Sequence, residues 1–176
     1  AVILPRDYKN AALNDSKKLT AKKRYALREQ IERDALAWAV GEVKPEEIDK
    51  VNILHASFLA MHRAIAQLQV EPEALIIDRN RFDPYPGLPH TCIVKGDGKY
   101  LSIAAASILA KTYRDDYMDA LARECPYYDW EHNKGYPTAK HYAGLEAHGP
   151  SVYHRRTFNL VGNRQTSINW DALPKE

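Results

Sequence analysis

Short apolar runs predict four strands in the first hundred residues. The runs are residues 1–4, 36–43, 74–77 and 90–94. Residues 74–77 form an unbroken apolar run rich in β-branched side chains, which is typical of a buried strand, whereas residues 36–43 alternate. A loop punctuated by proline and glycine, residues 83–89, then returns the chain to the last run.

Helical spacing of apolar residues predicts the rest of the regular structure. Thr20 is a suitable cap for an amphipathic helix that continues to Ala35. A short helix is expected from Pro45 to Val51, followed by a longer core-facing helix that starts at Ile53 and ends before Pro72. Two further helices are expected, over residues 101–125 and 138–148.

Three aspartates fall where these elements can bring them together. Asp78 follows the strand at 74–77, Asp97 follows the run at 90–94, and Asp115 lies on the next helix. Carboxylate oxygens are the ligands that magnesium and manganese prefer, and two such ions can hydrolyse a phosphodiester. A simpler interpretation remains open for each residue. Asp78 could cap the strand end, Asp97 could be a turn residue, and Asp115 could form an ion pair with a neighbouring basic side chain.

Basic and aromatic residues indicate a polyanionic partner. Lys17 and Lys18 lie in a loop just before a helix, where lysines can hold a phosphate. Tyr136 stands between a glycine and a proline, two residues after Lys134, so its ring is available to stack on a base or a sugar. The alternatives are a solvated basic face and a tyrosine that packs on the aromatic loop around residue 128.

Composition limits the class of protein. A chain of 176 residues that is 45% hydrophobic can bury one core, and its formal charge of +2 does not diagnose a partner. No apolar run approaches the length of about 18 residues that suggests a membrane span, so the expectation is a soluble, cytoplasmic protein. Two cysteines, Cys92 and Cys125, are too few for a disulfide framework and lack zinc-site spacing.

Two other motifs are weaker. His55 and His62 lie seven residues apart on one helix face, and polar groups at a helix edge explain them better than a metal site. The sequence KGDGK at 95–99 lacks the GxxxxGK[ST] spacing of a phosphate-binding loop. A phosphotransferase that uses this turn is therefore a distant alternative.

Seven motifs, taken together and in this order, resemble bacterial ribonuclease HII. They are LNDSKKL (13–19), NILHASFLAMHRAI (52–65), LIIDRN (75–80), VKGD (94–97), SIAAASILAKTYRD (102–115), HNKGYPT (132–138) and HRRTF (154–158). The resemblance covers nearly everything from residue 1 to about residue 158.

The resemblance implies an α/β fold of the ribonuclease H type, with a mixed central sheet flanked by helices and a helical C-terminal part. It implies a single domain over residues 1–158 and an irregular tail over 159–176. The implied activity is that of a monomeric endoribonuclease that uses Mg²⁺ or Mn²⁺. It would hydrolyse RNA in RNA/DNA hybrids and nick duplex DNA on the 5′ side of an embedded ribonucleotide, leaving a 3′-hydroxyl and a 5′-phosphate.

The same resemblance assigns roles to individual residues. Asp78 and Asp97 become metal ligands, and Asp115 becomes a catalytic residue near them. Tyr136 is expected to contact the sugar on the DNA side of the RNA-to-DNA junction, with Lys134 beside it. Ser16 and Lys17, with Lys18, are expected near the phosphate backbone.

One departure from the family pattern matters for activity. The family opens with a strand that carries a DExGRG motif. This motif supplies two further metal-binding carboxylates and a loop that senses the ribose 2′-hydroxyl. It is expected upstream of Ala1 and is not in this sequence. We therefore expect negligible cleavage by the chain as written, and a nucleic-acid-binding module without chemistry is the alternative function. A smaller departure is Arg79, where glycine is usual.

The tail carries one further hypothesis. Residues 165–170 read QTSINW, which loosely resembles a sliding-clamp-binding QxxLxF peptide, so a weak clamp contact is possible.

Overall fold

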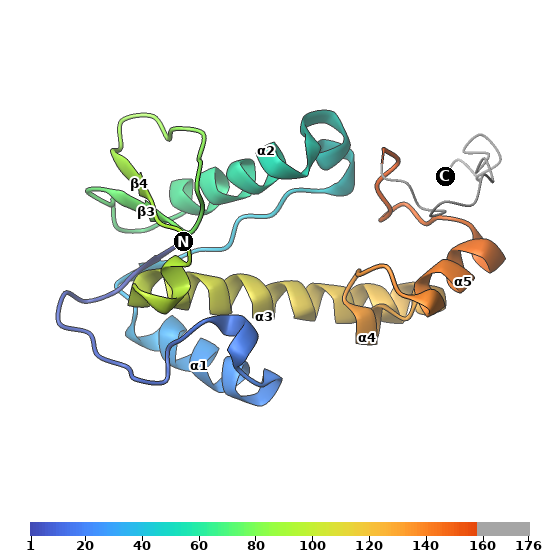
Figure 1. Cartoon of the computed structure of the whole chain (residues 1–176), viewed down its shortest axis with the longest axis horizontal. Coiled ribbons are helices and arrows are strands. Elements are labelled where there is room, and N and C mark those ends of the chain that lie inside the picture. The colour runs from blue at the N-terminus through green and yellow to red at the C-terminus, as the bar shows by residue number, and fades with distance from the viewer. Residues whose placement is uncertain (158–176) are drawn as a thin grey trace. The chain divides into compact units, whose positions relative to one another are not determined.

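The computed structural model describes residues 1–157 (Figure 1). The chain divides into two compact units, Ala1–Asp115 and a second unit that begins at Asp116. The expected single domain over residues 1–158 stays a prediction, and the two units are described in turn. The predicted tail and the peptide at 165–170 lie outside the described residues.

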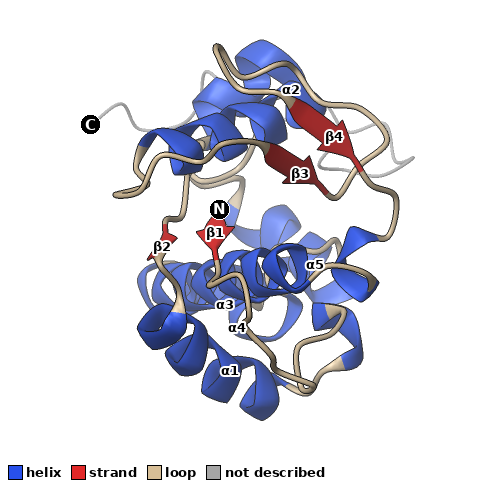
Figure 2. Ribbon diagram, turned by 90° about the vertical axis from the view of Figure 1, so that its left-hand side faces the viewer, coloured by secondary structure: helices blue, strands red, loops and turns tan. Residues whose placement is uncertain are grey.

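The first unit contains all four predicted strands, shorter than the sequence suggested. Strand β1 (Val2–Ile3) pairs antiparallel with β2 (Ala37–Trp38), and β3 (Leu75–Ile77) pairs parallel with β4 (His90–Cys92). Antiparallel and parallel strand pairing, which a mixed sheet combines, are thus both present. Within residues 1–157 they form two separate two-stranded sheets (Figure 2). No described segment supplies a strand that would join the pairs.

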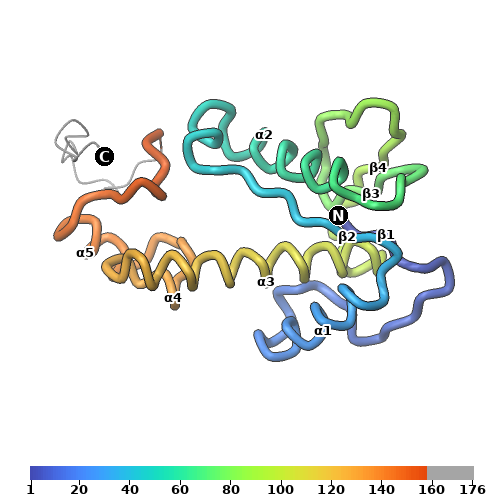
Figure 3. The backbone as a smooth tube through the Cα atoms, turned by 180° about the vertical axis from the view of Figure 1, so that it is seen from behind, coloured from blue at the N-terminus to red at the C-terminus, as the bar shows by residue number. Residues whose placement is uncertain are grey.

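Helix α1 (Ala21–Asp34) follows its predicted bounds because its ends are specified locally. Thr20 Oγ1 accepts a hydrogen bond from the Lys23 N–H, as an N-cap residue does. The helix buries Leu27 and Ile31 against the alanine-rich first half of α3 (Leu101–Glu124), and β1 and β2 pack on the same core (Figure 3).

Helix α2 (Pro45–Ala66) contains the break that the sequence predicted. Asn52 has a φ of 68°, which interrupts the helical backbone, and its Oδ1 accepts from the N–H groups of Leu54 (2.9 Å) and His55 (3.2 Å). Asparagine tolerates positive φ and caps helices, so this residue starts the second half of α2. That half packs on β3 through an apolar cluster that includes Phe58 and Ile77.

The second unit is helical, as predicted for the C-terminal part. After the end of α3 come η3 (Pro126–Tyr128), α4 (Trp130–Asn133) and α5 (Ala139–His148). Their core is an aromatic-rich cluster of Met118, Leu121, Tyr128, Trp130 and Leu145. Gly144 of α5 is required by close packing, because a Cβ there would lie 2.1 Å from the Tyr127 carbonyl oxygen.

Two buried histidines face each other in this unit. The rings of His141 and His154 lie 5.3 Å apart beside Tyr128 and Trp130. His154 Nδ1 accepts from the Ser151 N–H at 3.0 Å. Burial lowers the pKa of His154 to about 4, helped by the neighbouring His141, and burial also lowers the pKa of His141.

This arrangement predicts acid sensitivity of the second unit. The unfolded chain binds a proton on His154 near pH 6.5, and the folded chain binds it only near pH 4. The contribution of the neutral His154 to the free energy of unfolding is therefore fully present above pH 6.5 and is lost as the pH falls toward 4. At pH 5 the loss is about 2 kcal/mol relative to pH 8. Urea unfolding at several pH values between 5 and 8 measures this change in the free energy of unfolding.

The variant His154→Gln keeps an acceptor for Ser151 but cannot be protonated. It is expected to flatten the pH dependence. The matched control is His148→Gln, because His148 is an exposed histidine of the same unit. An unchanged pH dependence in His154→Gln would refute the assignment.

None of the helices in residues 1–157 is both long and apolar enough to cross a lipid bilayer.

Candidate active site

Asp78 and Asp97 follow two neighbouring strand ends, and the structure brings them together. Because β3 and β4 are parallel, their carboxyl ends meet at one edge of the pair. The Gly96 N–H donates a 2.7 Å hydrogen bond to Asp78 Oδ1, which ties the turn that carries Asp97 to the end of β3. Lys95 enters this turn with a φ of 56°, and Gly96 is buried against Ile103, whose Cδ1 would lie 2.5 Å from an added Cβ. The predicted convergence of these two aspartates is therefore present.

A third carboxylate, that of Asp15, lies close enough for its negative charge to act on Asp97, as that of Asp78 does. Burial raises the pKa of the Asp97 carboxyl, and the charges of Asp15 and Asp78 raise it further. The sequence did not single out Asp15; its place in the LNDSKKL motif was the available signal.

Asp115 lies elsewhere. Its carboxylate is buried, 2.6 Å from Lys111 Nζ and 3.8 Å from an Arg24 guanidinium nitrogen. Asp97 lies in the turn just before α3, and a helix rises about 1.5 Å per residue, so Asp115 lies about 20 Å along α3 from its start at Leu101. The structure thus gathers two of the three predicted aspartates, and it gives Asp115 the ion-pair surroundings of the simpler interpretation.

The predicted phosphate-binding segment forms η1 (Ser16–Lys18). Asp15 Oδ1 accepts from the Lys17 N–H at 2.9 Å and caps this turn. The Ser16 side chain is buried, with its Oγ 2.8 Å from Ser107 Oγ on α3, so its hydroxyl anchors the segment internally. Lys17 and Lys18 are exposed. The two lysines are therefore available at the surface, next to the acidic group.

In the second unit, Tyr136 is 63% exposed at the crest of the predicted turn. The buried Asn133 shapes this turn: its Nδ2 donates to the Tyr128 carbonyl at 2.7 Å, and its Oδ1 accepts from the Gly135 N–H at 2.8 Å. Lys134 Nζ forms an ion pair with Asp119, so this predicted nucleic-acid-binding residue has an acidic partner within its own unit. The exposure of Tyr136 argues against a ring packed as a lid.

Comparisons with known proteins address the family directly. The sequence model of the ribonuclease HII family matches residues 1–161. Ribonuclease HII of Bacteroides thetaiotaomicron is 68% identical over 170 residues, which are 97% of this chain and 85% of that protein. Ribonuclease HII of Phocaeicola vulgatus is 69% identical over 162 residues, 92% of this chain and 81% of that protein.

The chain belongs to the ribonuclease HII family.

The fold agrees with that membership. The crystal structure of ribonuclease H2 from Pyrococcus horikoshii superimposes with a TM-score of 0.68 at 23% identity, covering 84% of this chain and 77% of that one. The α/β ribonuclease H-like fold with a helical C-terminal part, implied by the sequence motifs, is confirmed. As a member of the ribonuclease HII family, the chain is a ribonuclease H hydrolase that acts on nucleic acid.

Ribonuclease HII enzymes generally depend on divalent metal ions, and the acidic group of the first unit fits such an ion. Asp78, Asp97 and Asp15 all offer carboxylate oxygens, the donors that hard divalent cations prefer. Burial raises the pKa of Asp97, and the negative charges of Asp15 and Asp78 raise it further. A bound cation would offset the repulsion between them.

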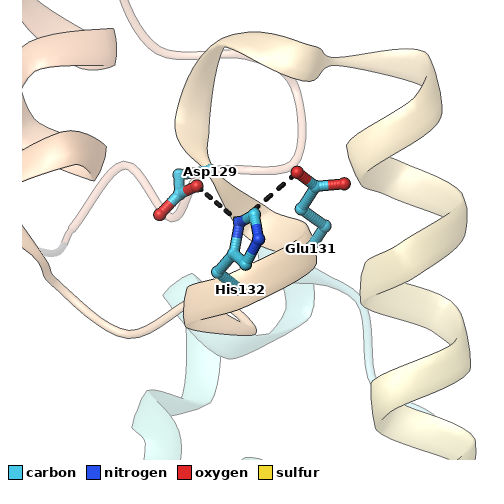
Figure 4. Close-up of side chains that lie close together, drawn as sticks. All are labelled: Asp129, Glu131 and His132. Carbon is cyan, nitrogen blue, oxygen red and sulfur yellow. Dashed lines mark hydrogen bonds and ion pairs between the residues drawn. The ribbon is translucent and has the colours of Figure 1, made fainter.

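A second group of possible ligands lies in the other unit of this ribonuclease HII chain. His132 Nδ1 lies 2.8 Å from Asp129 Oδ1 and 3.3 Å from Glu131 Oε1 (Figure 4). Polar contacts of the imidazole with two neighbouring carboxylates account for this arrangement, and both His132 and Glu131 are about two-thirds exposed. The sequence did not single out this group, and none of the predicted metal ligands belongs to it.

Sequence reasoning missed one partner of the α2 histidines. That partner is Asp83. Its Oδ2 lies 2.7 Å from His55 Nδ1, and its carbonyl oxygen lies 2.9 Å from His62 Nε2. An acidic neighbour of His55 thus exists because the loop after β3 folds back onto α2. Hydrogen bonds to this loop explain both histidines. Cys92 and Cys125 are both free thiols.

Proposed function

We propose that this chain carries the catalytic domain of an endoribonuclease that nicks duplex DNA on the 5′ side of an embedded ribonucleotide. The same site would hydrolyse the RNA strand of RNA/DNA hybrids, with Mg²⁺ or Mn²⁺ as cofactor, leaving a 3′-hydroxyl and a 5′-phosphate. The observation that supports this proposal most is the approach of Asp78 and Asp97 at the ends of β3 and β4, fixed by the hydrogen bond from Gly96. Family membership supplies the reaction class.

Asp78 and Asp97 would hold the metal. When bound, divalent ions activate water and stabilise the leaving oxygen of a phosphodiester. The protein's own contribution is to fix the carboxylates before the ion arrives. Asp78 is already oriented by the Gly96 N–H, and the turn that carries Asp97 is fixed by the buried Gly96 against Ile103.

Substrate binding would use the basic and aromatic residues. Lys17 and Lys18 extend from a capped turn anchored to α3, so they can contact backbone phosphates without reading sequence. Tyr136 presents an exposed ring that can pack against a sugar at the RNA-to-DNA junction. Lys134, held by Asp119, would support that turn.

The deciding experiment is a cleavage assay of the chain preceded by a DExGRG segment, on a duplex with a single ribonucleotide, in Mg²⁺ or Mn²⁺. The proposal expects one nick on the 5′ side of the ribonucleotide, with a 3′-hydroxyl and a 5′-phosphate at the break. An all-DNA duplex of the same sequence is the negative control, and an RNA/DNA hybrid tests the second substrate. Cleavage of the all-DNA duplex at equal rate would exclude a ribonucleotide-dependent nuclease.

The 176-residue polypeptide itself is expected to show negligible cleavage while still binding the duplex. Asp78 and Asp97 supply two metal carboxylates, and the resemblance places two more in the DExGRG motif, so two ions would not be fixed without it. The same chain with a DExGRG segment ahead of Ala1 is expected to cleave. Robust turnover by the mass-verified 176-residue product would show that the metal ligands have been misassigned. Binding without cleavage by both proteins would favour a nucleic-acid-binding module.

A further inference from the structure

Arg24 is tied more closely to the turn before α1 than to its acidic partner. Its Nη1 donates to the carbonyl oxygen of Leu19 at 2.6 Å, just after η1, and to that of Ser16 at 3.2 Å, the first residue of η1. The Asp115 carboxylate lies 3.8 Å from Arg24 Nη2, and its nearer partner is Lys111 Nζ at 2.6 Å. One largely buried guanidinium therefore holds both ends of this turn.

The place of Arg24 in α1 is unfavourable for a cation. The helix begins at Ala21, so Arg24 lies in its first turn, where the positive end of the helix dipole favours aspartate or glutamate. Burial adds a further cost, because an arginine taken out of water needs acceptors for its N–H groups. Contacts outside the helix, with η1 and Asp115, therefore account for an arginine at this position.

Ser107 of α3 holds the same turn at a second point. Its Oγ lies 2.8 Å from the Oγ of Ser16, whose side chain is buried. The turn is thus fixed to α1 by Arg24 and to α3 by Ser107, while Lys17 and Lys18 stay exposed. Its backbone is anchored, and only its basic side chains reach the solvent.

We propose that Arg24 and Ser107 are positioning residues for nucleic-acid binding. They fix the η1 backbone so that Lys17 and Lys18 meet backbone phosphates together. This inference rests on the proposed function, in which these lysines contact the substrate. The lysines are adjacent in the chain, so the backbone between them sets where both ammonium groups lie. A turn that is fixed before binding also loses less conformational entropy when the complex forms.

Arg24→Lys tests the proposal because lysine keeps the positive charge, but its side chain is one bond shorter and has no second nitrogen for Asp115. Binding of the 176-residue chain to an all-DNA duplex is measured over a range of NaCl concentrations. Each phosphate contact contributes about 0.9 to the slope of log K against log salt, so losing both lysine contacts lowers the slope by about 1.8. Arg24→Lys is expected to lower it by about 1 or more. A loss of stability in a chain that stays folded leaves the slope unchanged.

Arg28→Lys is the matched control. Arg28 lies one turn further along α1, has a side chain that is 18% exposed, pairs with Glu32 and stacks on the Tyr113 ring. This variant is expected to lose stability and to keep the wild-type slope. The double variant Lys17→Gln with Lys18→Gln, measured alongside, gives the slope without either lysine contact.

Hydrogen exchange of the peptide that covers residues 13–19 gives a second readout, which needs no nucleic acid. The Lys17 N–H donates to Asp15 Oδ1 and the Lys18 N–H to the Asp15 carbonyl, both at 2.9 Å, so their protection reports the conformation of the turn. Arg24→Lys and Ser107→Ala are each expected to lose this protection. Ser107→Ala is a mild change at a half-buried residue, and it decides the proposal if Arg24→Lys does not fold.

The outcomes separate this inference from the function on which it rests. If the wild-type chain does not bind the duplex, or the double variant keeps the wild-type slope, the proposed use of the lysines fails and the inference falls with it. If the double variant lowers the slope while Arg24→Lys and Ser107→Ala keep the slope and protection of wild type, the lysines stand and the positioning role is overturned. A lowered slope with lost protection, absent from Arg28→Lys, supports that role.

Discussion

Replacement of Asp97 with asparagine is expected to abolish nicking at a ribonucleotide in the protein that carries a DExGRG segment ahead of this chain. A metal ligand supplies several kcal/mol of transition-state stabilisation, so a loss of about 4 kcal/mol corresponds to a rate lowered about 1000-fold. The rate is measured under single-turnover conditions on the single-ribonucleotide duplex. Asp78→Asn is expected to have the same effect, since the two carboxylates share the site.

The geometry around Asp97 makes this loss distinguishable from unfolding. Asp97 is repelled by Asp15 and Asp78, and those charges with burial raise its pKa. Asparagine removes the repulsion, so the variant without metal should be at least as stable as wild type. The control is Asp7→Asn, which replaces an exposed aspartate and is expected to leave the nicking rate unchanged. Full activity of either Asp97→Asn or Asp78→Asn would refute the site.

Asp115→Asn is expected to act on stability instead. The substitution leaves Arg24, whose side chain is 14% exposed, without its acidic partner in the core between α1 and α3. Removing one partner of a buried ion pair costs about 3 kcal/mol or more in unfolding free energy, because the other charge stays buried. Urea unfolding at pH 7 measures the difference.

Asp119→Asn provides a matched comparison on the same helix. Asp119 also pairs with a lysine, Lys134, but its side chain is 38% exposed. An exposed pair contributes about 1 kcal/mol or less, so this variant should be nearly as stable as wild type. A fully stable but inactive Asp115→Asn would instead place Asp115 in the catalytic machinery, as the sequence first suggested.

Local signals predicted most of the elements that build the site. Thr20 caps α1, Asn52 divides α2, and the run at 74–77 forms β3, because each depends on residues adjacent in the chain. Asp78 and Asp97 were identified for the same reason. Each directly follows a strand or turn, and parallel strands bring such residues to one edge.

The sequence by itself therefore determined the family, the order of the elements and the two aspartates at the strand ends. Only the tertiary structure decided which other acids join them. Asp15 approaches Asp97, and Asp115 approaches Arg24, because α1 and the turn before it pack on α3. No local periodicity encodes contacts between residues so far apart in the chain. Asp15 thus caps η1 and also lies near Asp97, and Asp115 lies in a buried ion pair.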